Sequence, residues 1–219
     1  MIDFLKFVID FILHIDKHLY EIVSQYQTWT YLILFLIIFC ETGLVVTPFL
    51  PGDSLLFAAG AIAAMPGNPI SIGLLVLVVM LAALSGDSTN YWIGRFLGQT
   101  VYEKNYRLIR REYLDKTHAF YEKHGGKTLI MARFMPILRT FAPFVAGVGT
   151  MKYFRFFSFS LIGNIIWVNS FCWAGYFFGN IPFVQKNFTL VVLAIIAVSL
   201  VPPVYAGVKT WLSGRQNTA

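Results

Sequence analysis

The chain has 219 residues, of which 57% are hydrophobic and only 13% are charged, and its formal net charge is +6. A soluble domain is nearer half apolar and a quarter charged, so this composition excludes an ordinary soluble protein and indicates one membrane domain over residues 1–219. The positive charge favours contact with an anionic membrane face, and the absence of a basic soluble fold excludes nucleic-acid binding.

The N-terminal segment predicts a surface helix. Its charged residues recur at steps of three, four and seven, which places them along one face of a helix over residues 2–24, with the apolar residues elsewhere. This pattern is typical of an amphipathic helix that lies at the membrane interface.

The next apolar segment, residues 29–64, contains two acids, Glu41 and Asp53. Three residues that disfavour a continuous helix interrupt it: Pro48, Pro51 and Gly52. Neither half needs to cross the membrane, so we expect a re-entrant helical hairpin with a buried turn. Asp53 follows Pro-Gly and is expected to be the N-cap of the second half-helix, and this structural role is weighed evenly against a role in transport.

Residues 70–98 predict a long transmembrane helix that becomes polar near its end. Asp87, Asn90 and Tyr91 are three and four residues apart, so they share a helical face. Residues 100–126 follow as the one long hydrophilic segment, in which aromatic and basic residues alternate. That segment predicts a basic amphipathic helix on the membrane surface.

A second interrupted segment spans residues 127–149 and carries the opposite charge. It contains Arg133 and Arg139 on either side of Pro136, and Pro143 follows as a further supporting residue. We therefore expect a second re-entrant hairpin. Residues 153–179 and 188–210 are each long enough to cross a bilayer, which needs about 20 residues, and predict two plain transmembrane helices.

Two local matches indicate an internal repeat. Residues 57–61 (Phe-Ala-Ala-Gly-Ala) resemble residues 144–148 (Phe-Val-Ala-Gly-Val), and residues 92–98 and 173–179 both read Trp-x-Gly-x-Phe-x-Gly. The basic flanks place residues 100–127 and the C-terminus in the cytoplasm. The two hairpins then open to opposite sides, so we expect inverted halves whose turns meet near the midplane.

The meeting point would hold the two acids of the first hairpin and the two arginines of the second, with Asp87 nearby. An ion-pair network that only locks the fold is one interpretation. We favour a site, because broken helices with charges at the break are typical of transporters. Guanidinium groups suit phosphate oxygens, and carboxylates in a low-dielectric site can take up protons.

No metal, cofactor or enzyme activity is expected, since neither hairpin contains a His nucleophile or a metal-ligand cluster. A lipid phosphatase and a membrane scaffold remain as alternatives. Self-association into a homo-oligomer stays open.

Three motifs resemble the bacterial DedA family, which is related to the VTT proteins. They are Glu-Thr-Gly…Pro-Phe-Leu-Pro-Gly-Asp (41–53), Gly-Asp…Asn-Tyr-x-x-Gly-Arg (86–95) and Arg-Phe-x-Pro-x-x-Arg-Thr (133–140). The resemblance implies a multi-pass protein of the bacterial inner membrane that moves lipids. Undecaprenyl phosphate is the substrate favoured here, and phosphatidylethanolamine translocation or proton-dependent drug tolerance are the alternatives. It also implies that the family's essential acids correspond to Glu41 and Asp53 and its essential arginines to Arg133 and Arg139.

Overall fold

The computed structural model describes residues 21, 23, 25–44, 52–104, 126–149, 151–195 and 197, and the regular structure in these ranges is entirely helical. The helices are η1 (Gln27–Trp29), α3 (Thr30–Gly43), α4 (Gly52–Ala63), α5 (Ile72–Lys104), α7 (Lys127–Ala132), α8 (Pro136–Val148), α9 (Tyr153–Phe178) and α10 (Pro182–Lys186). Within the described ranges, two stretches are long and apolar enough to cross a membrane, Ile72–Gly98 and Tyr153–Phe178. The prediction of an all-α membrane protein is confirmed at this level.

Several predicted segments lie wholly or partly outside the described residues. These are most of 2–24 and of 100–126, the turn containing Pro48 and Pro51, and the end of 188–210, of which residues 188–195 are helical. The candidate membrane span Ile72–Gly98 lies within the predicted transmembrane segment 70–98, and the helix α5 itself continues beyond it to Lys104. No proline interrupts residues 98–104, and one glycine is a weaker helix breaker, so the hydrophilic residues simply extend the helix.

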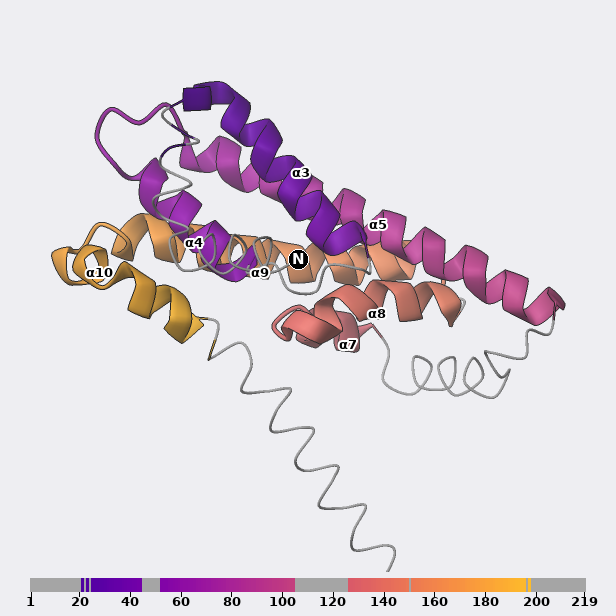
Figure 1. Ribbon diagram of the computed structural model, residues 1–219. Coiled ribbons are helices and arrows are strands. Elements are labelled where there is room, and N and C mark those ends of the chain that lie inside the picture. The colour runs from indigo at the N-terminus through magenta and orange to yellow at the C-terminus, as the bar shows by residue number, and fades with distance from the viewer. Residues whose placement is uncertain are drawn as a thin grey trace, which may run out of the picture.

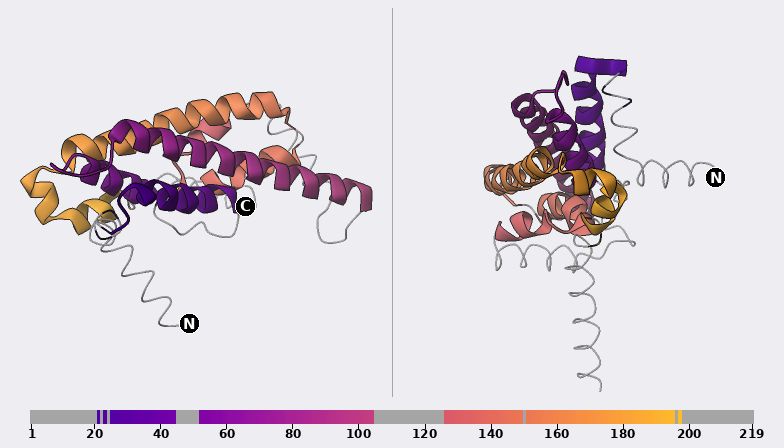
Figure 2. Two further views of the ribbon diagram at one scale, coloured as in Figure 1. Left: turned by 90° about the horizontal axis from the view of Figure 1, so that it is seen from above. Right: turned by 90° about the vertical axis from the view of Figure 1, so that its left-hand side faces the viewer.

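The long helices α5 and α9 run in opposite directions through the centre of the molecule (Figure 1). α3 packs along the first part of α5, and α7 packs on α9. The two remaining half-helices cross over, because α4 packs mainly on α9 and α8 packs mainly on α5. Seen from above, the described helices form an elongated bundle, and the second view looks at this bundle from one end (Figure 2).

The outer surface of the bundle is apolar. Leu74, Leu77 and Leu81 recur at steps of three and four along α5 and are about half exposed. α9 presents Ile162, Ile165 and Ile166 in the same way. Such an apolar surface would promote aggregation in water, and it is suited to contact with lipid chains.

Small residues let α4 approach α9 closely. A Cβ added to Gly60 would collide with the carbonyl oxygen of Cys172, and a Cβ added to Gly175 would collide with that of Phe57. Backbone therefore lies directly against backbone here, as small residues allow at helix interfaces in membranes.

The contact between α8 and α5 has the same design. A Cβ on Gly147 would collide with the carbonyl oxygen of Tyr91, and one on Gly94 would collide with that of Phe144. Gly147, Phe144 and Gly94 are the counterparts, in the two pairs of similar sequence motifs, of Gly60, Phe57 and Gly175, and Tyr91 and Cys172 each directly precede the Trp of their motif. Each motif of the first half thus packs against the other type of motif from the second half.

Candidate functional site

Two buried apolar clusters occupy the interior, and the charged residues lie between them. Along α5, Ala83 belongs to the first cluster and Tyr91 to the second, with Asp87 between them. Along α9, Phe156 belongs to the second cluster and Trp167 to the first. The charged region is therefore near the middle of both candidate membrane-spanning stretches, at the depth where ionisable groups are most costly.

The break between α7 and α8 positions both arginines. Met135 is extended (φ −118°, ψ 110°), as expected for the residue before a proline, and Pro136 is the first residue of α8. Arg133 follows the last residue of α7, and Arg139 lies one turn into α8. Pro143 is buried inside α8, where its missing N–H leaves the carbonyl of Arg139 without the usual helical donor.

The junction of α3 and α4 positions the two acids. Glu41 is in the last turn of α3, and its Oε1 accepts a hydrogen bond of 3.3 Å from the N–H of Gly52, the first residue of α4. Asp53 was expected to be the N-cap of the second half-helix. It lies instead within the first turn of α4, which begins at Gly52. The acceptor for the Gly52 N–H is instead the carboxylate of Glu41, which belongs to α3. A negative charge is favourable there because the N-terminal end of the α4 dipole is positive.

Arg139 pairs with both acids of this junction. Its Nη1 lies 2.7 Å from Asp53 Oδ1, and its Nη2 bonds Glu41 Oε1. The three residues are 5%, 7% and 3% exposed respectively, so the pairing is shielded from solvent. We call Arg139, Glu41 and Asp53 the Arg139 cluster.

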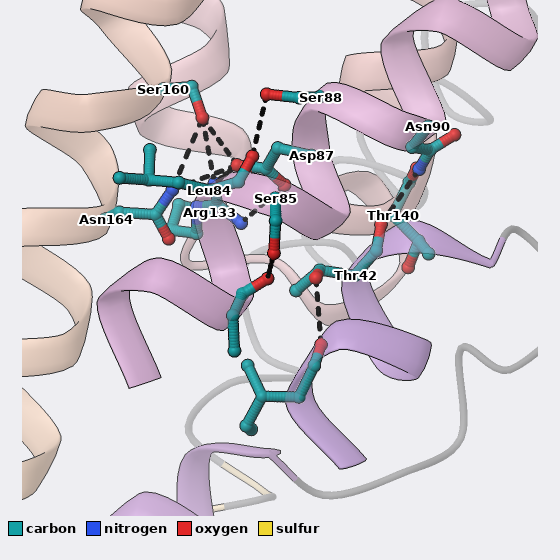
Figure 3. Close-up of polar contacts among 12 residues, drawn as sticks. Thr42, Leu84, Ser85, Asp87, Ser88, Asn90, Arg133, Thr140, Ser160 and Asn164 are labelled. Carbon is teal, nitrogen blue, oxygen red and sulfur yellow. Dashed lines mark hydrogen bonds and ion pairs between the residues drawn. The ribbon is translucent and has the colours of Figure 1, made fainter. Parts of the chain in front are cut away.

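Arg133 pairs with a different acid, Asp87 of α5. Its Nη1 lies 3.2 Å from Asp87 Oδ1 and its Nη2 bonds Oδ2, so the guanidinium engages the carboxylate at both oxygens (Figure 3). Ser160 and Asn164 of α9 also donate hydrogen bonds to Asp87 Oδ2, the latter at 2.9 Å. We call these four residues the Arg133 cluster.

Trp167 of α9 connects the two clusters. Its Nε1–H donates a hydrogen bond of 2.8 Å to Asp53 Oδ1. The guanidinium carbons of Arg139 and Arg133 lie 4.8 and 5.9 Å from the centre of its ring, within the range of cation–π attraction. One fully buried aromatic side chain thus touches both arginines.

Three of these residues are not among the site residues predicted from the sequence: Ser160, Asn164 and Trp167. They are four and seven residues apart on α9, and so share a face. A polar and aromatic face on an otherwise apolar membrane helix was the available signal, but residues 153–179 were interpreted as a plain span.

Asn90 joins the two broken segments without any charge. Its Nδ2 donates to the carbonyl oxygens of Thr42 in α3, at 3.0 Å, and Thr140 in α8, at 2.7 Å (Figure 3). Tyr91 lies with the second apolar cluster instead, stacked on Phe156 at 4.5 Å between ring centres, and its hydroxyl donates to the carbonyl of Met151. Of the three residues predicted on one face of α5, Asp87 and Asn90 therefore adjoin the breaks and Tyr91 does not.

Among the described residues no group of three His, Cys, Asp or Glu side chains could hold a metal ion. In chemical terms, the site offers two guanidinium groups, three carboxylates and several neutral donors in an enclosed interior. It is suited to binding an anion or exchanging protons.

The comparisons with known proteins agree with the resemblance of the motifs. The VTT domain matches residues 50–177. Protein DedA of Escherichia coli is 58% identical over 203 residues, which cover 92% of this chain and 93% of that protein. An uncharacterized membrane protein of Mycobacterium tuberculosis is 44% identical over 183 residues, 83% of this chain and 80% of that one. The inner membrane protein YqjA of Escherichia coli is 35% identical over 159 residues, 71% of this chain and 70% of that one. No solved structure matches. The chain belongs to the DedA family of VTT-domain membrane proteins.

Proposed function

We propose that this protein moves a lipid with a phosphate headgroup across the bacterial inner membrane, with proton-linked coupling, and that the favoured lipid is a polyprenyl phosphate such as undecaprenyl phosphate. The observation that supports it is the pairing of two buried arginines with acids at the helix breaks. The inner membrane is the location given in the name of one relative, YqjA.

The cost of burying arginine supports a functional site. An arginine at the bilayer centre costs about 2.5–3.5 kcal/mol on insertion scales, so two of them require compensation. Carboxylates provide it in the empty state. In the loaded state a phosphate can provide it, because the planar guanidinium fork matches phosphate oxygens.

The architecture proposed here is a pair of inverted halves, each with a re-entrant hairpin. α8 has 13 residues, about 20 Å at the usual helical rise, and the hydrocarbon core is about 30 Å thick. α7, with six residues, is shorter still, and the 12-residue α4 is similar. Half-helices of this length are better suited to enter and return than to cross. The matched glycine contacts of α4–α9 and α8–α5 support the repeat.

Coupling follows from competition for arginine. When a lipid phosphate binds Arg139, the acids that it displaces lose their positively charged partner. This loss favours the uptake of a proton by those acids. Proton binding and phosphate binding then favour one another, and by linkage the effect is reciprocal.

The experiment is translocation of a lipid phosphate in proteoliposomes over a pH series. Arg139→Lys and Arg133→Lys keep the charge but lose the fork, and each should reduce the rate about tenfold, which equals about 1.4 kcal/mol. Phosphatidylethanolamine vesicles and a phosphate-release assay run in parallel. Movement of phosphatidylethanolamine alone, release of inorganic phosphate, or no movement of any lipid would each point to one of the other functions and contradict the proposal.

The proposed orientation has residues 100–127 and the C-terminus in the cytoplasm, because the basic flanks lie there. In a Lys116→Cys variant whose native Cys40 and Cys172 are replaced by serine, the new thiol should resist an impermeant reagent in spheroplasts and react after lysis. Ready labelling of intact spheroplasts would reverse the orientation.

A further inference from the structure

The buried charges of the two clusters, counted over the described residues, do not balance. The two clusters contain three acids, Glu41, Asp53 and Asp87, and two arginines, all 7% exposed or less. Residues 44–51, which join α3 to α4, have no ionisable side chain, so the turn supplies no compensating charge. With every acid ionised, the two clusters together would hold one uncompensated negative charge in the membrane interior, which is costly.

The imbalance belongs to the Arg139 cluster. In the Arg133 cluster one guanidinium faces one carboxylate, and the remaining partners, Ser160 and Asn164, are neutral donors. In the Arg139 cluster one guanidinium faces two carboxylates. The extra negative charge is therefore shared between Glu41 and Asp53.

The two acids differ in their hydrogen bonds. Asp53 Oδ1 accepts from both Arg139 Nη1 and Trp167 Nε1–H, two donors that favour the ionised form. Among the described residues, both hydrogen bonds of Glu41 reach the same oxygen, Oε1, which accepts from Arg139 and from the Gly52 N–H. Its Oε2 is buried without a hydrogen-bond partner among the described residues.

We propose that Glu41 holds the exchangeable proton, on Oε2, and that Asp53 and Asp87 stay ionised as the counter-charges of Arg139 and Arg133. The inference rests on the proposed function and names the acid on which its coupling depends. Among the described residues, the ionisable groups around Glu41 are Arg139 from α8, Asp53 from α4 and Arg133 at the end of α7, and Asp87 from α5 completes the set as the partner of Arg133. A proton on Oε2 makes this set neutral, and the proton comes from and returns to water.

This assignment gives the proton a defined effect on the substrate. Neutral Glu41 retains Oε1 as an acceptor for the Gly52 N–H, so the start of α4 is preserved. It no longer competes for Arg139 as a charge, which leaves the guanidinium with Asp53 and with capacity for a phosphate oxygen. Protonated protein should therefore bind a lipid phosphate more tightly than deprotonated protein.

The test is infrared spectroscopy of the purified full-length protein in lipid nanodiscs at neutral pH, without substrate. The wild-type protein should show the carbonyl stretch of a protonated carboxylic acid. Carboxyl-¹³C glutamate should shift this band, and carboxyl-¹³C aspartate should leave it in place. Glu41→Gln should remove it, and the matched Glu21→Gln variant should retain it.

These readouts do not require transport, so they separate this inference from the proposed function. Absence of the band in wild-type protein, a shift with labelled aspartate, or survival of the band in Glu41→Gln would each overturn the assignment. Binding of a short-chain polyprenyl phosphate provides the second measurement: wild-type affinity should fall about tenfold per pH unit above the titration point, whereas Glu41→Gln should bind equally at every pH. Equal pH dependence in both proteins would also overturn it.

Discussion

The Arg139 and Arg133 clusters lie side by side in the same buried layer, and Trp167 touches both, yet they differ in charge. The Arg133 cluster is a closed pair, in which Asp87 is saturated by one guanidinium and two neutral donors from α9. The Arg139 cluster contains one arginine, two acids and an oxygen, Glu41 Oε2, that has no hydrogen-bond partner in the described part of the chain. The two arginines therefore differ in their surroundings: Arg133 faces one carboxylate and Arg139 faces two.

The largest expected effect is on the closed pair. Asp87→Asn keeps the shape of the side chain but leaves Arg133 as a buried charge without its carboxylate, which should cost about 3–5 kcal/mol of unfolding free energy. Equilibrium unfolding in detergent micelles measures it. Ser88→Ala, the next residue of α5, is the control and should cost less than about 1 kcal/mol. Equal stability of Asp87→Asn and wild type would show that the pair does not brace the fold.

A smaller loss should follow when the link between the clusters is weakened. Trp167→Phe keeps an aromatic ring near both guanidinium groups but removes the Nε1–H donor of Asp53. A hydrogen bond to a charged group contributes about 1.5–3 kcal/mol, so the unfolding free energy should fall by that amount. Trp173→Phe on the same helix loses only a bond to Asn169 and is the matched control. Identical losses of unfolding free energy in the two variants would mean that the hydrogen bond from Trp167 to Asp53 contributes no more than the bond from Trp173 to Asn169.

The glycine contacts test whether the scaffold around the clusters is equivalent in both halves. Gly60→Ala and Gly147→Ala each force a Cβ against a carbonyl oxygen of a facing helix, so each should cost about 1–3 kcal/mol, and the two losses should be similar. Gly73→Ala, where a Cβ meets nothing within 4 Å, should be neutral or slightly stabilising. A large loss at one contact alone would show that the halves are not equivalent.

The smallest effect on stability should come from Glu41→Gln. If the open cluster holds its proton on Glu41, a neutral amide resembles the native state, and the unfolding free energy should change by less than about 1 kcal/mol. Asp53→Asn, by contrast, removes the charge that faces Arg139 and should be clearly less stable. The order of these two variants in the same unfolding assay tests the difference between the acids, and the reverse order would contradict it.

The sequence predicted the elements better than it predicted the partners. Prolines and glycines mark real helix boundaries, since Gly52 and Pro136 begin α4 and α8. Glu41, Asp53, Arg133 and Arg139 stand out because charges are rare in apolar segments. Which arginine meets which acid was not accessible, because it depends on how α4 and α8 cross over. The pattern of charge along the sequence therefore could not distinguish Asp87, the partner of Arg133, from a supporting residue.

The residues of α9 illustrate the same limit. Ser160 and Asn164 are ordinary polar residues in a long apolar helix, and their importance appears only when Asp87 of another helix lies beside them. The spacing of polar residues within one helix shows which residues share a face. Which residues of another helix lie opposite that face depends on the tertiary structure.

The crossover of α4 and α8 bears on how the protein is made. α4 packs mainly on α9, which is synthesised after the first half of the chain. The face of α4 that contains Gly60 therefore has no helix to pack against while the first half enters the membrane. Neither half can reach its final arrangement alone, and we expect fragments 1–110 and 111–219 to be degraded separately but to assemble when co-expressed. By this reasoning, an ancestor that consisted of a single half would have formed an intertwined dimer. In that dimer the half-helix that corresponds to α4 or α8 would have packed on the long helix of the other copy.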